Sequence, residues 1–217
     1  MKTAPSSPRP SSPRGPRPGQ LSDLQRSQRQ ASREAIVLAL RRLLDRALFD
    51  DIAIEDILGE AGVSRATFYR HFKTKREVAI ALNDMTMQGA IGHFRGLSII
   101  RERDGMVRWV KQLIAIYRRN GGASALIMML GASDAGFHRR QRADRMRLVE
   151  MLAQADPALA GALGDSPEAA AFAARIDLWL MMLDRICVEI AVHRRLPHAD
   201  AYIEEIAAQW MALVDTA

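Results

Sequence analysis

The sequence is short of cysteine, aromatic residues and long apolar runs, and each shortage removes a class of protein. Its 217 residues include a single cysteine, Cys187, so no internal disulfide can form and a disulfide-stapled secreted scaffold is excluded. No apolar run approaches the roughly 18 residues of a membrane span, and the first residues lack the apolar core of a secretory signal. Aromatic residues make up 6%, and strand-like alternation is hard to find. We therefore expect a soluble, cytoplasmic, mostly helical protein with no membrane partner.

Motifs for catalysis and metal binding are also missing from the sequence. There is no G-x-S-x-G, no P-loop, no G-x-G-x-x-G and no H-E-x-x-H, and the five histidines lack metal-ligand spacing. Cys187 lies in an apolar helical stripe, which predicts a buried and inert thiol. We expect no enzyme activity, no catalytic residues, no cofactor and no metal site.

The formal net charge of +6 is unevenly placed along the chain. Residues 1–20 hold four basic residues and no acid, residues 21–80 hold eleven basic and nine acidic residues, and residues 81–217 are neutral. Six of the nine prolines lie in residues 1–20, which contain no Ile, Leu, Val or aromatic residue. Such a segment buries too little apolar area to offset the entropy of ordering. We expect a disordered, basic tail over residues 1–25, either a solubilising leader or a segment that touches a nucleic acid backbone.

Apolar residues at helical spacing begin after this tail. Ile36, Leu40 and Leu44 form one stripe, which predicts a helix over about residues 26–47. A second, short helix is predicted by the apolar set Ile54, Ile57, Leu58 and Ala61. Gly62 suits the left-handed position that ends a helix, and Ser64 suits the N-cap of the next. The close succession of these two signals predicts a tight helix-turn-helix.

The third predicted helix, over residues 65–72, has an apolar side and a basic side. Phe68 and Phe72 are four residues apart and are expected to face the core. From Ser64 to Arg76 there are five basic residues and no acid. Residues 34–60 carry seven acids and three bases, so the sign of the charge changes at the helix that such proteins insert into the major groove. A capping box at 74–77 opens a fourth helix that runs to about residue 94.

The segment from Ile54 to Glu77 resembles the DNA-binding signature of the TetR family of tetracycline-repressor-like regulators. The matching elements are the Ala-Gly-Val-Ser turn, Thr67, the Phe68-Tyr69 pair, His71-Phe72, and Lys75 with Glu77 behind it. The resemblance implies an all-α fold with an N-terminal three-helix helix-turn-helix DNA-binding domain over residues 26–80. It also implies a C-terminal helical ligand-binding and dimerisation domain over residues 81–217, with operator DNA and a second copy of the chain as partners.

The expected contacts with double-stranded DNA follow from the chemistry of the side chains in this segment. Tyr69, Thr67 and His71 can donate to phosphates, and Arg65 can pair with the edge of a guanine. Lys75 lies in the first turn of the fourth helix, where free N–H groups attract phosphate. The expected DNA-binding residues are Arg33, Ser64, Arg65, Ala66, Thr67, Tyr69, Arg70, His71, Lys73 and Lys75.

One position departs from the family's pattern. The family usually has Thr or Ser at the start of the second helix, where this chain has Ile52-Ala53. The phosphate contact normally made there is therefore in question.

For Phe68 and Phe72 a purely structural role in the core is the preferred interpretation, whereas for Tyr69 we prefer a contact with DNA.

The remaining residues predict helices over about 102–120, 122–132, 136–155, 167–194 and 198–215. The last two are the expected dimerisation helices. One carries Ile176, Leu180, Leu183, Cys187 and Ile190 at helical spacing, and the other carries Ile203, Ile206, Ala207, Trp210 and Val214. In the family such a pair packs against its mate, and a two-fold dimer reads two half-sites of a near-palindrome.

The middle helices are rich in large, soft apolar residues, which favours a chamber for a small apolar effector. The expected lining residues are Met85, Trp109, Leu113, Ile116, Tyr117, Met128, Met129, Phe137, Trp179 and Met182. Tyr117, Asn120, Asp177 and Arg185 are the candidate polar anchors. An ordinary helical core is the alternative interpretation for any single member, and the family resemblance favours the chamber, with a loose similarity to the ethionamide-regulator subgroup.

The sequence thus predicts a DNA-binding transcriptional regulator, most simply a repressor, that a small apolar effector releases from its operator. The alternative is an architectural or partner-binding helix-turn-helix protein without an effector. A helical enzyme that merely carries such a motif is disfavoured, because the C-terminal residues show no paired acid–base or nucleophilic groups.

Overall fold

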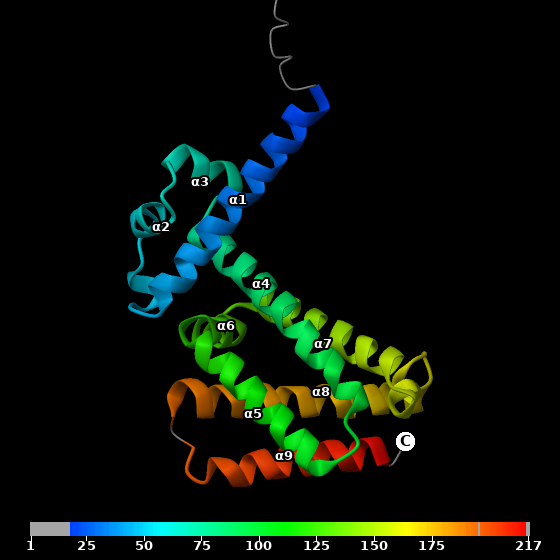
Figure 1. Cartoon of the computed structure of the whole chain (residues 1–217). Helices are drawn as coiled ribbons and strands as arrows, with labels where there is room; N and C mark the ends of the chain where they lie inside the picture. The colour runs from blue at the N-terminus through cyan, green and yellow to red at the C-terminus, as the bar shows by residue number, and fades with distance from the viewer. Residues whose placement is uncertain (1–17, 195, 216–217) are drawn as a thin grey trace, which may run out of the picture.

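The computed structural model describes residues 18–194 and 196–215, and within them it contains helices and no strand. Most of the expected tail, residues 1–17, lies outside the described residues. Figure 1 shows two groups of helices joined by one long helix, which confirms the all-α prediction. The α-helices in the described part are α1 (Pro18–Leu44), α2 (Ile54–Ala61), α3 (Arg65–His71), α4 (Lys75–Arg95), α5 (Arg103–Arg119), α6 (Gly121–Ser133), α7 (Ala135–Ala155), α8 (Pro167–Val188) and α9 (Ala199–Asp215).

Helix α1 begins well before the residue that the apolar pattern indicates. The pattern places the start near residue 26, whereas the helix begins at Pro18. Proline fits the first turn of a helix because its fixed φ suits the helix and its missing N–H has no partner there. Residues 18–25, which the composition assigned to the tail, are therefore helical, and this part of α1 projects away from the other helices (Figure 1).

The N-terminal group is built on the apolar stripes that the sequence shows. Ile36 and Leu40 of α1, Ile57 of α2 and Phe68 of α3 are fully buried in one cluster. Leu82 of α4 is buried in the same cluster. Helix α4 then leaves this group and reaches the C-terminal group, so it joins the two cores (Figure 1).

The N-terminal core also takes in residues from the second half of the sequence. Leu126 and Leu130 of α6 and Phe137 of α7 are buried in the same cluster as α1 and α4. Helix α6 starts beside the end of α1, where a Cβ on Gly122 would lie 2.2 Å from the Leu44 carbonyl oxygen. Glycine permits this approach because it has no Cβ. A boundary at residue 80 therefore does not separate two independent cores.

The C-terminal core is centred on three tryptophans from α5, α8 and α9. The ring centroids of Trp109 and Trp179 are 6.4 Å apart, and those of Trp179 and Trp210 are 4.5 Å apart. The indole N–H of Trp179 donates to the carbonyl oxygen of Ile206 at 3.1 Å. Helix α8 ends in a π-helical turn, Glu189–His193, before the chain turns back into α9. No described helix is both long and apolar enough to cross a membrane.

The apolar residues expected at the dimer interface lie inside the protomer instead. Each of the following, except the half-buried Ile190, is buried in the C-terminal core: Ile176, Leu180, Leu183, Cys187, Ile190, Ile203, Ile206, Ala207, Trp210 and Val214. These side chains pack α8 and α9 against each other and against α5. The outward face of α8 carries a different apolar set, namely Leu178, Met181 and Met182. The side chains that the sequence analysis assigned to the dimer interface are thus core residues of the protomer, and the role of α8 and α9 in dimerisation stays a prediction.

Candidate functional site

The helix-turn-helix is closed by the backbone and hydroxyl groups that the sequence predicts. Gly62 ends α2 in the left-handed region, with φ 65° and ψ 34°. The Ser64 Oγ accepts the N–H of Thr67 at 3.2 Å and so caps α3. The Thr74 Oγ1 accepts the N–H of Glu77 at 3.2 Å, and the Glu77 carboxylate accepts the N–H of Lys73 at 2.8 Å. Both caps are confirmed, and together they fix α3 between α2 and α4.

Helix α3 is anchored by one face and exposes the other. Phe68 is 0% exposed and Phe72 3%, which confirms their place in the core. Tyr69 is 48% exposed and meets the Phe68 ring edge-on, with the centroids 5.4 Å apart. Ala66, Arg70 and Lys73 are also exposed. The exposed side of α3 and the residues just after it therefore present the Tyr69 phenol, the Ala66 methyl group and the cationic side chains of Arg70 and Lys73.

Three of the expected DNA-binding residues have partners within the motif. The Arg65 guanidinium is paired with the carboxylate of Glu55 on α2. Both side chains are more than half exposed, and such surface pairs contribute only about 0–1 kcal/mol, so Arg65 can exchange Glu55 for another acceptor. The Ser64 hydroxyl donates to Thr67 Oγ1 at 3.1 Å, which orients the Thr67 hydroxyl.

Helix α1 continues the basic surface of α3. The imidazole Nε2 of His71 lies 3.3 Å from the Ser32 hydroxyl, which joins the end of α3 to α1. Partial burial lowers the pKa of His71, and the positive charges of Arg70, Arg29 and Arg33 lower it further. The Arg33 guanidinium lies 5.0 Å from the Phe72 ring centroid. The expected contact Arg33 and the unpredicted Arg29 thus belong to the same positive surface, whereas His71 favours its neutral form.

Lys75 has a different position from the one that we expected. Its ammonium donates to the carbonyl oxygens of Phe49 and Ile52 at 2.5 and 2.6 Å and lies 4.4 Å from the Phe49 ring centroid. These contacts hold the 3₁₀ turn Phe49–Asp51 against the start of α4. The sequence could not show this, because the carbonyls come from a turn more than twenty residues earlier. The phosphate contact of the Lys75 side chain stays a prediction, with a structural role now beside it.

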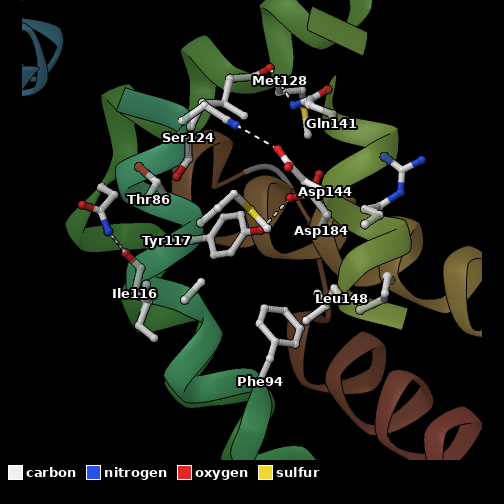
Figure 2. Close-up of a pocket in the computed structure, with 17 residues that line it drawn as sticks. Thr86, Phe94, Ile116, Tyr117, Ser124, Met128, Gln141, Asp144, Leu148 and Asp184 are labelled. Carbon is white, nitrogen blue, oxygen red and sulfur yellow. Dashed lines mark hydrogen bonds between the residues drawn. The ribbon is translucent and has the colours of Figure 1, made fainter. Parts of the chain in front are cut away.

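The C-terminal group contains a cavity of about 130 Å³ between α4, α5, α6, α7 and α8 (Figure 2). Figure 2 shows Phe94 and Leu148 at one end of it and Ser124, Gln141 and Asp144 at the other. The lining residues are Asn83, Thr86, Met87, Ala90, Phe94, Ile116, Tyr117, Asn120, Ser124, Ile127, Met128, Gln141, Asp144, Arg145, Leu148, Leu180 and Asp184.

Three residues of the predicted lining set border this cavity, namely Ile116, Tyr117 and Met128. The candidate anchor Asn120 borders it as well. The seven others lie elsewhere. Two of them pack with the N-terminal core, namely Met85 and Phe137. Three are buried in the C-terminal core, namely Trp109, Leu113 and Trp179. Two are 42% exposed at the surface, namely Met129 and Met182.

These misplacements have a common physical reason. Helical periodicity shows that a residue belongs to an apolar face, but it does not show which neighbouring helix covers that face. Phe137 lies in the first turn of α7, where its N–H is capped by Asp134, and its side chain is buried in the N-terminal core. Asp177 and Arg185, two candidate anchors, do not border the cavity, and Asp177 instead accepts the guanidinium of Arg145 at 2.8 Å.

Apart from Tyr117 and Asn120, the polar lining was missed, because polar residues in a helix are usually read as solvent-facing. The hydroxyl of Tyr117 donates to the Asp184 carboxylate at 2.5 Å. Burial raises the pKa of Asp184, although the bond from Tyr117 and the charges of Arg145 and Arg185 lower it in part. Burial also raises the pKa of Tyr117 well above its usual value, so the phenol stays protonated and acts as the donor.

A second carboxylate, that of Asp144, also borders the cavity. It accepts the Asn83 amide at 3.4 Å and the Arg147 guanidinium at 2.9 Å. Asp144 therefore already has a cationic partner, Arg147, whose side chain lies at the surface. The cavity thus has an apolar end and an acidic end, an arrangement suited to binding a small molecule.

The fold and these two sites define a class of protein: a helix-turn-helix protein whose basic helix is joined to a helical body with an internal cavity. Comparison with known proteins agrees. The family model described as bacterial regulatory proteins, tetR family, matches residues 36–82. The chain is 40% identical over 63 residues to the HTH-type transcriptional regulator EthR of Mycolicibacterium smegmatis, a match that covers 29% of each protein. The match thus spans less than a third of that relative.

Two solved structures are similar over most of the chain. A tetR-family transcriptional regulator from Streptomyces coelicolor matches with a TM-score of 0.58 and 17% identity, over 85% of this chain and 80% of that one. A transcriptional regulator of the TerR/AcrR family from Aquifex aeolicus matches with a TM-score of 0.55 and 13% identity, over 82% of this chain and 96% of that one. At these identities the likeness concerns the fold. Residues 36–82 are thus similar to the tetR family of bacterial regulatory proteins, and the fold of most of the chain is similar to that of the two solved regulators.

Proposed function

We propose that this protein is a homodimeric transcriptional repressor that binds a near-palindromic operator and is released from it by a small effector. The observation that carries the proposal is the two-sided helix α3. Phe68 and Phe72 fix it in the core, whereas Tyr69, Arg70 and Lys73 face solvent in a stretch without an acid. An exposed aromatic phenol among cations is unfavourable for a merely solvated helix and suits a phosphate backbone.

The DNA contacts divide into those that read bases and those that hold the backbone. In our proposal α3 enters the major groove, where Arg65 leaves Glu55 to pair with a base edge and Ala66 touches a thymine methyl. Tyr69, Arg70 and Lys73 bind phosphates beside the groove, and Thr67 and His71 donate hydrogen bonds there. Arg29 and Arg33 of α1 extend the phosphate contacts, because their charges act on His71 at the end of α3.

The second copy of the chain is proposed to dock on the outward face of α8. Leu178, Met181 and Met182 follow one another at helical spacing and are 58%, 46% and 42% exposed. Tyr202 of α9 adds a further exposed aromatic side chain. Exposed apolar side chains gathered in this way mark contact surfaces, and a two-fold dimer would present two α3 helices to successive turns of DNA about 34 Å apart.

The effector is proposed to act through the two helices that the cavity shares with the DNA-binding group. Helix α4 contributes Val78 to the N-terminal core and Phe94 to the cavity. Helix α6 contributes Leu126 to that core and Met128 to the cavity. A ligand that binds better when the cavity is wider shifts the protein towards a state in which these helices have moved. The separation of the two α3 helices then no longer fits the operator.

The DNA-binding proposal is tested by selecting bound duplexes from a random pool with the wild-type protein. The expected product contains two half-sites in inverted orientation. Tyr69→Phe and Arg70→Gln should each weaken binding to that duplex while leaving the melting temperature unchanged, because Phe keeps the ring against Phe68 and Arg70 is exposed. Loss of the Arg70 contact with one phosphate should lower the slope of log affinity against log salt by about 0.9, whereas loss of the neutral Tyr69 hydroxyl should leave that slope unchanged. Enrichment of no sequence, with a binding affinity that these variants leave unaltered, would contradict the proposal.

A substitution away from α3 provides the matched control. Arg119 is an exposed arginine at the end of α5, and Arg119→Gln should leave both the affinity and the salt slope as in the wild type. The direction of regulation is tested with a reporter placed behind the selected duplex. Transcription should rise when the protein is removed, whereas a fall would identify an activator. An architectural protein would bind many duplexes with equal affinity.

A further inference from the structure

The acidic end of the cavity contains one carboxylate that lacks a cationic partner. Asp184 accepts the Tyr117 hydroxyl at 2.5 Å, and in the part of the chain that the structure describes no basic side chain forms an ion pair with it. The two nearby arginines are engaged elsewhere. Arg145 binds Asp177 at 2.8 Å, and Arg185 binds Glu189 at 2.5 Å.

The Asp184 carboxylate can be reached both from solvent and from the cavity. The residue is exposed, so its charge is hydrated when the cavity is empty, and an ammonium that enters the cavity can form a charge-assisted hydrogen bond with it. The Tyr117 hydroxyl can donate one hydrogen bond, which leaves the other lone pairs of Asp184 available. The carboxylate borders a cavity instead of the packed core, so a ligand can reach it.

The opposite end of the cavity is suited to a hydrocarbon group. Phe94, Leu148 and Leu180 border it, and Figure 2 shows Phe94 and Leu148 away from the acidic end. The volume of about 130 Å³ is comparable with that of engineered apolar cavities of roughly 150 Å³ that admit benzene. A ligand of this size can place one apolar group against Phe94 and one polar group against Asp184.

We propose that the effector is a small amphipathic cation, an amine whose ammonium binds Asp184 beside Tyr117 and whose apolar part packs against Phe94, Leu148 and Leu180. The inference rests on the proposed function, since it names the chemistry of the effector that the cavity takes. It replaces the purely apolar effector that the sequence predicts. An anionic effector is disfavoured, because the guanidinium of Arg145 is already bound by Asp177 and a second carboxylate, Asp144, borders the same end.

The test compares three probes of one shape and different charge, measured by calorimetry on the full chain at neutral pH. 2-Phenylethylamine is the cation, 2-phenylethanol the neutral control and phenylacetate the anion. The amine should bind at least about tenfold more tightly than the alcohol, because a hydrogen bond to a charged partner is stronger than a neutral one. Phenylacetate should bind more weakly than both.

Two variants assign the preference to one side chain. Asp184→Asn retains an acceptor for the Tyr117 hydroxyl and should reduce the affinity for the amine about tenfold while leaving the affinity for the alcohol unchanged. Glu150→Gln removes an exposed carboxylate from α7 that does not border the cavity, and it should change neither affinity. Melting temperatures of both variants, compared with that of the wild type, verify that they fold.

The possible results separate the charge inference from the proposed function. If the alcohol or phenylacetate binds as tightly as the amine, or if Asp184→Asn preserves the preference, the cationic effector is wrong while a small-molecule effector stands. If none of the three probes binds at millimolar concentration, both the cationic effector and the effector part of the proposed function are overturned. DNA binding by α3 is unaffected by either result.

Discussion

A single ammonium group holds the turn between the first two helices in place. The three carbonyl oxygens nearest to the Lys75 Nζ belong to Phe49, Asp50 and Ile52, at 2.5, 3.4 and 2.6 Å. The Phe49 carbonyl also accepts the N–H of Ile52 at 3.3 Å, and Lys75 is half-buried. Without the ammonium, water would have to replace its hydrogen bonds to the three carbonyls at a partly closed site. The side chain therefore contributes to the stability of the DNA-binding group whether or not DNA is present.

Lys75→Met retains the aliphatic stem and removes the donor. We expect the free energy of unfolding to fall by about 1–2 kcal/mol, because hydrogen bonds to charged groups contribute about 1.5–3 kcal/mol and water restores part of the loss. Chemical denaturation monitored by circular dichroism measures this. Lys73→Met is the matched control, since Lys73 is exposed and should change stability by less than about 0.5 kcal/mol.

Measuring both the stability of Lys75→Met and its affinity for the selected duplex distinguishes the two roles of Lys75. A variant that is as stable as the wild type but binds the selected duplex more weakly would show that the ammonium leaves its carbonyls to bind phosphate. In that case the structural account of Lys75 would be wrong and the sequence-based prediction correct.

At the scale of elements, α6 is the helix whose position depends most strictly on one residue. The carbonyl oxygen of Leu44 occupies the space that a Cβ on Gly122 would need. The obstacle is backbone, which cannot rotate aside like a side chain. Any larger residue at position 122 must therefore separate the start of α6 from the end of α1.

Gly122→Ala should destabilise the protein by about 1–3 kcal/mol, the usual cost of forcing extra volume into a packed site. The neighbouring Gly121 has nothing within 4 Å of its Cβ position, so Gly121→Ala should be neutral or slightly stabilising. Thermal unfolding of the two variants measures the difference. Equal melting temperatures would show that α6 can shift freely away from α1.

The elements of the N-terminal group were predictable, because each of their signals acts over a few residues. Gly62, Ser64 and the N-cap Thr74 lie next to the ends that they define, and all three are confirmed, whereas Glu77 accepts the N–H of Lys73 instead of the Thr74 N–H that a capping box requires. The cavity was much less predictable. Its lining depends on how five helices are placed, and Asp184 has no feature in the sequence that distinguishes it from a solvent-facing acid. From the sequence alone, a tryptophan such as Trp179 could equally well fill the core or line a ligand chamber.

At the scale of the whole molecule, the proposed dimer requires the outward face of α8. Leu178 and Met181 contribute nothing to the protomer's core, so charges at these positions should leave the fold intact and oppose association. Leu178→Glu combined with Met181→Glu should change the protein from a dimer to a monomer in light scattering after gel filtration. The control is Ile99→Glu, which charges another exposed apolar residue, 81% exposed, outside the proposed interface.

A double variant that remains dimeric would place the interface on another surface. A double variant that becomes monomeric should also bind the selected duplex more weakly, because one α3 helix then contacts one half-site. The melting temperature, compared with that of the Ile99→Glu control, reports whether the protomer itself is intact.

Because α6 and the start of α7 are buried in the N-terminal core, the DNA-binding group cannot be transferred to another protein as one continuous segment. Leu126, Leu130 and Phe137 cover the apolar sides of α1 and α4. A fragment that ends after α4 would lose this cover and expose apolar surface. A chimaera that joins this helix-turn-helix to another effector-binding body must therefore transfer α6 as well, or redesign the surface that receives it. The unit that can be recombined is discontinuous in the sequence, although the DNA-recognition motif itself is not.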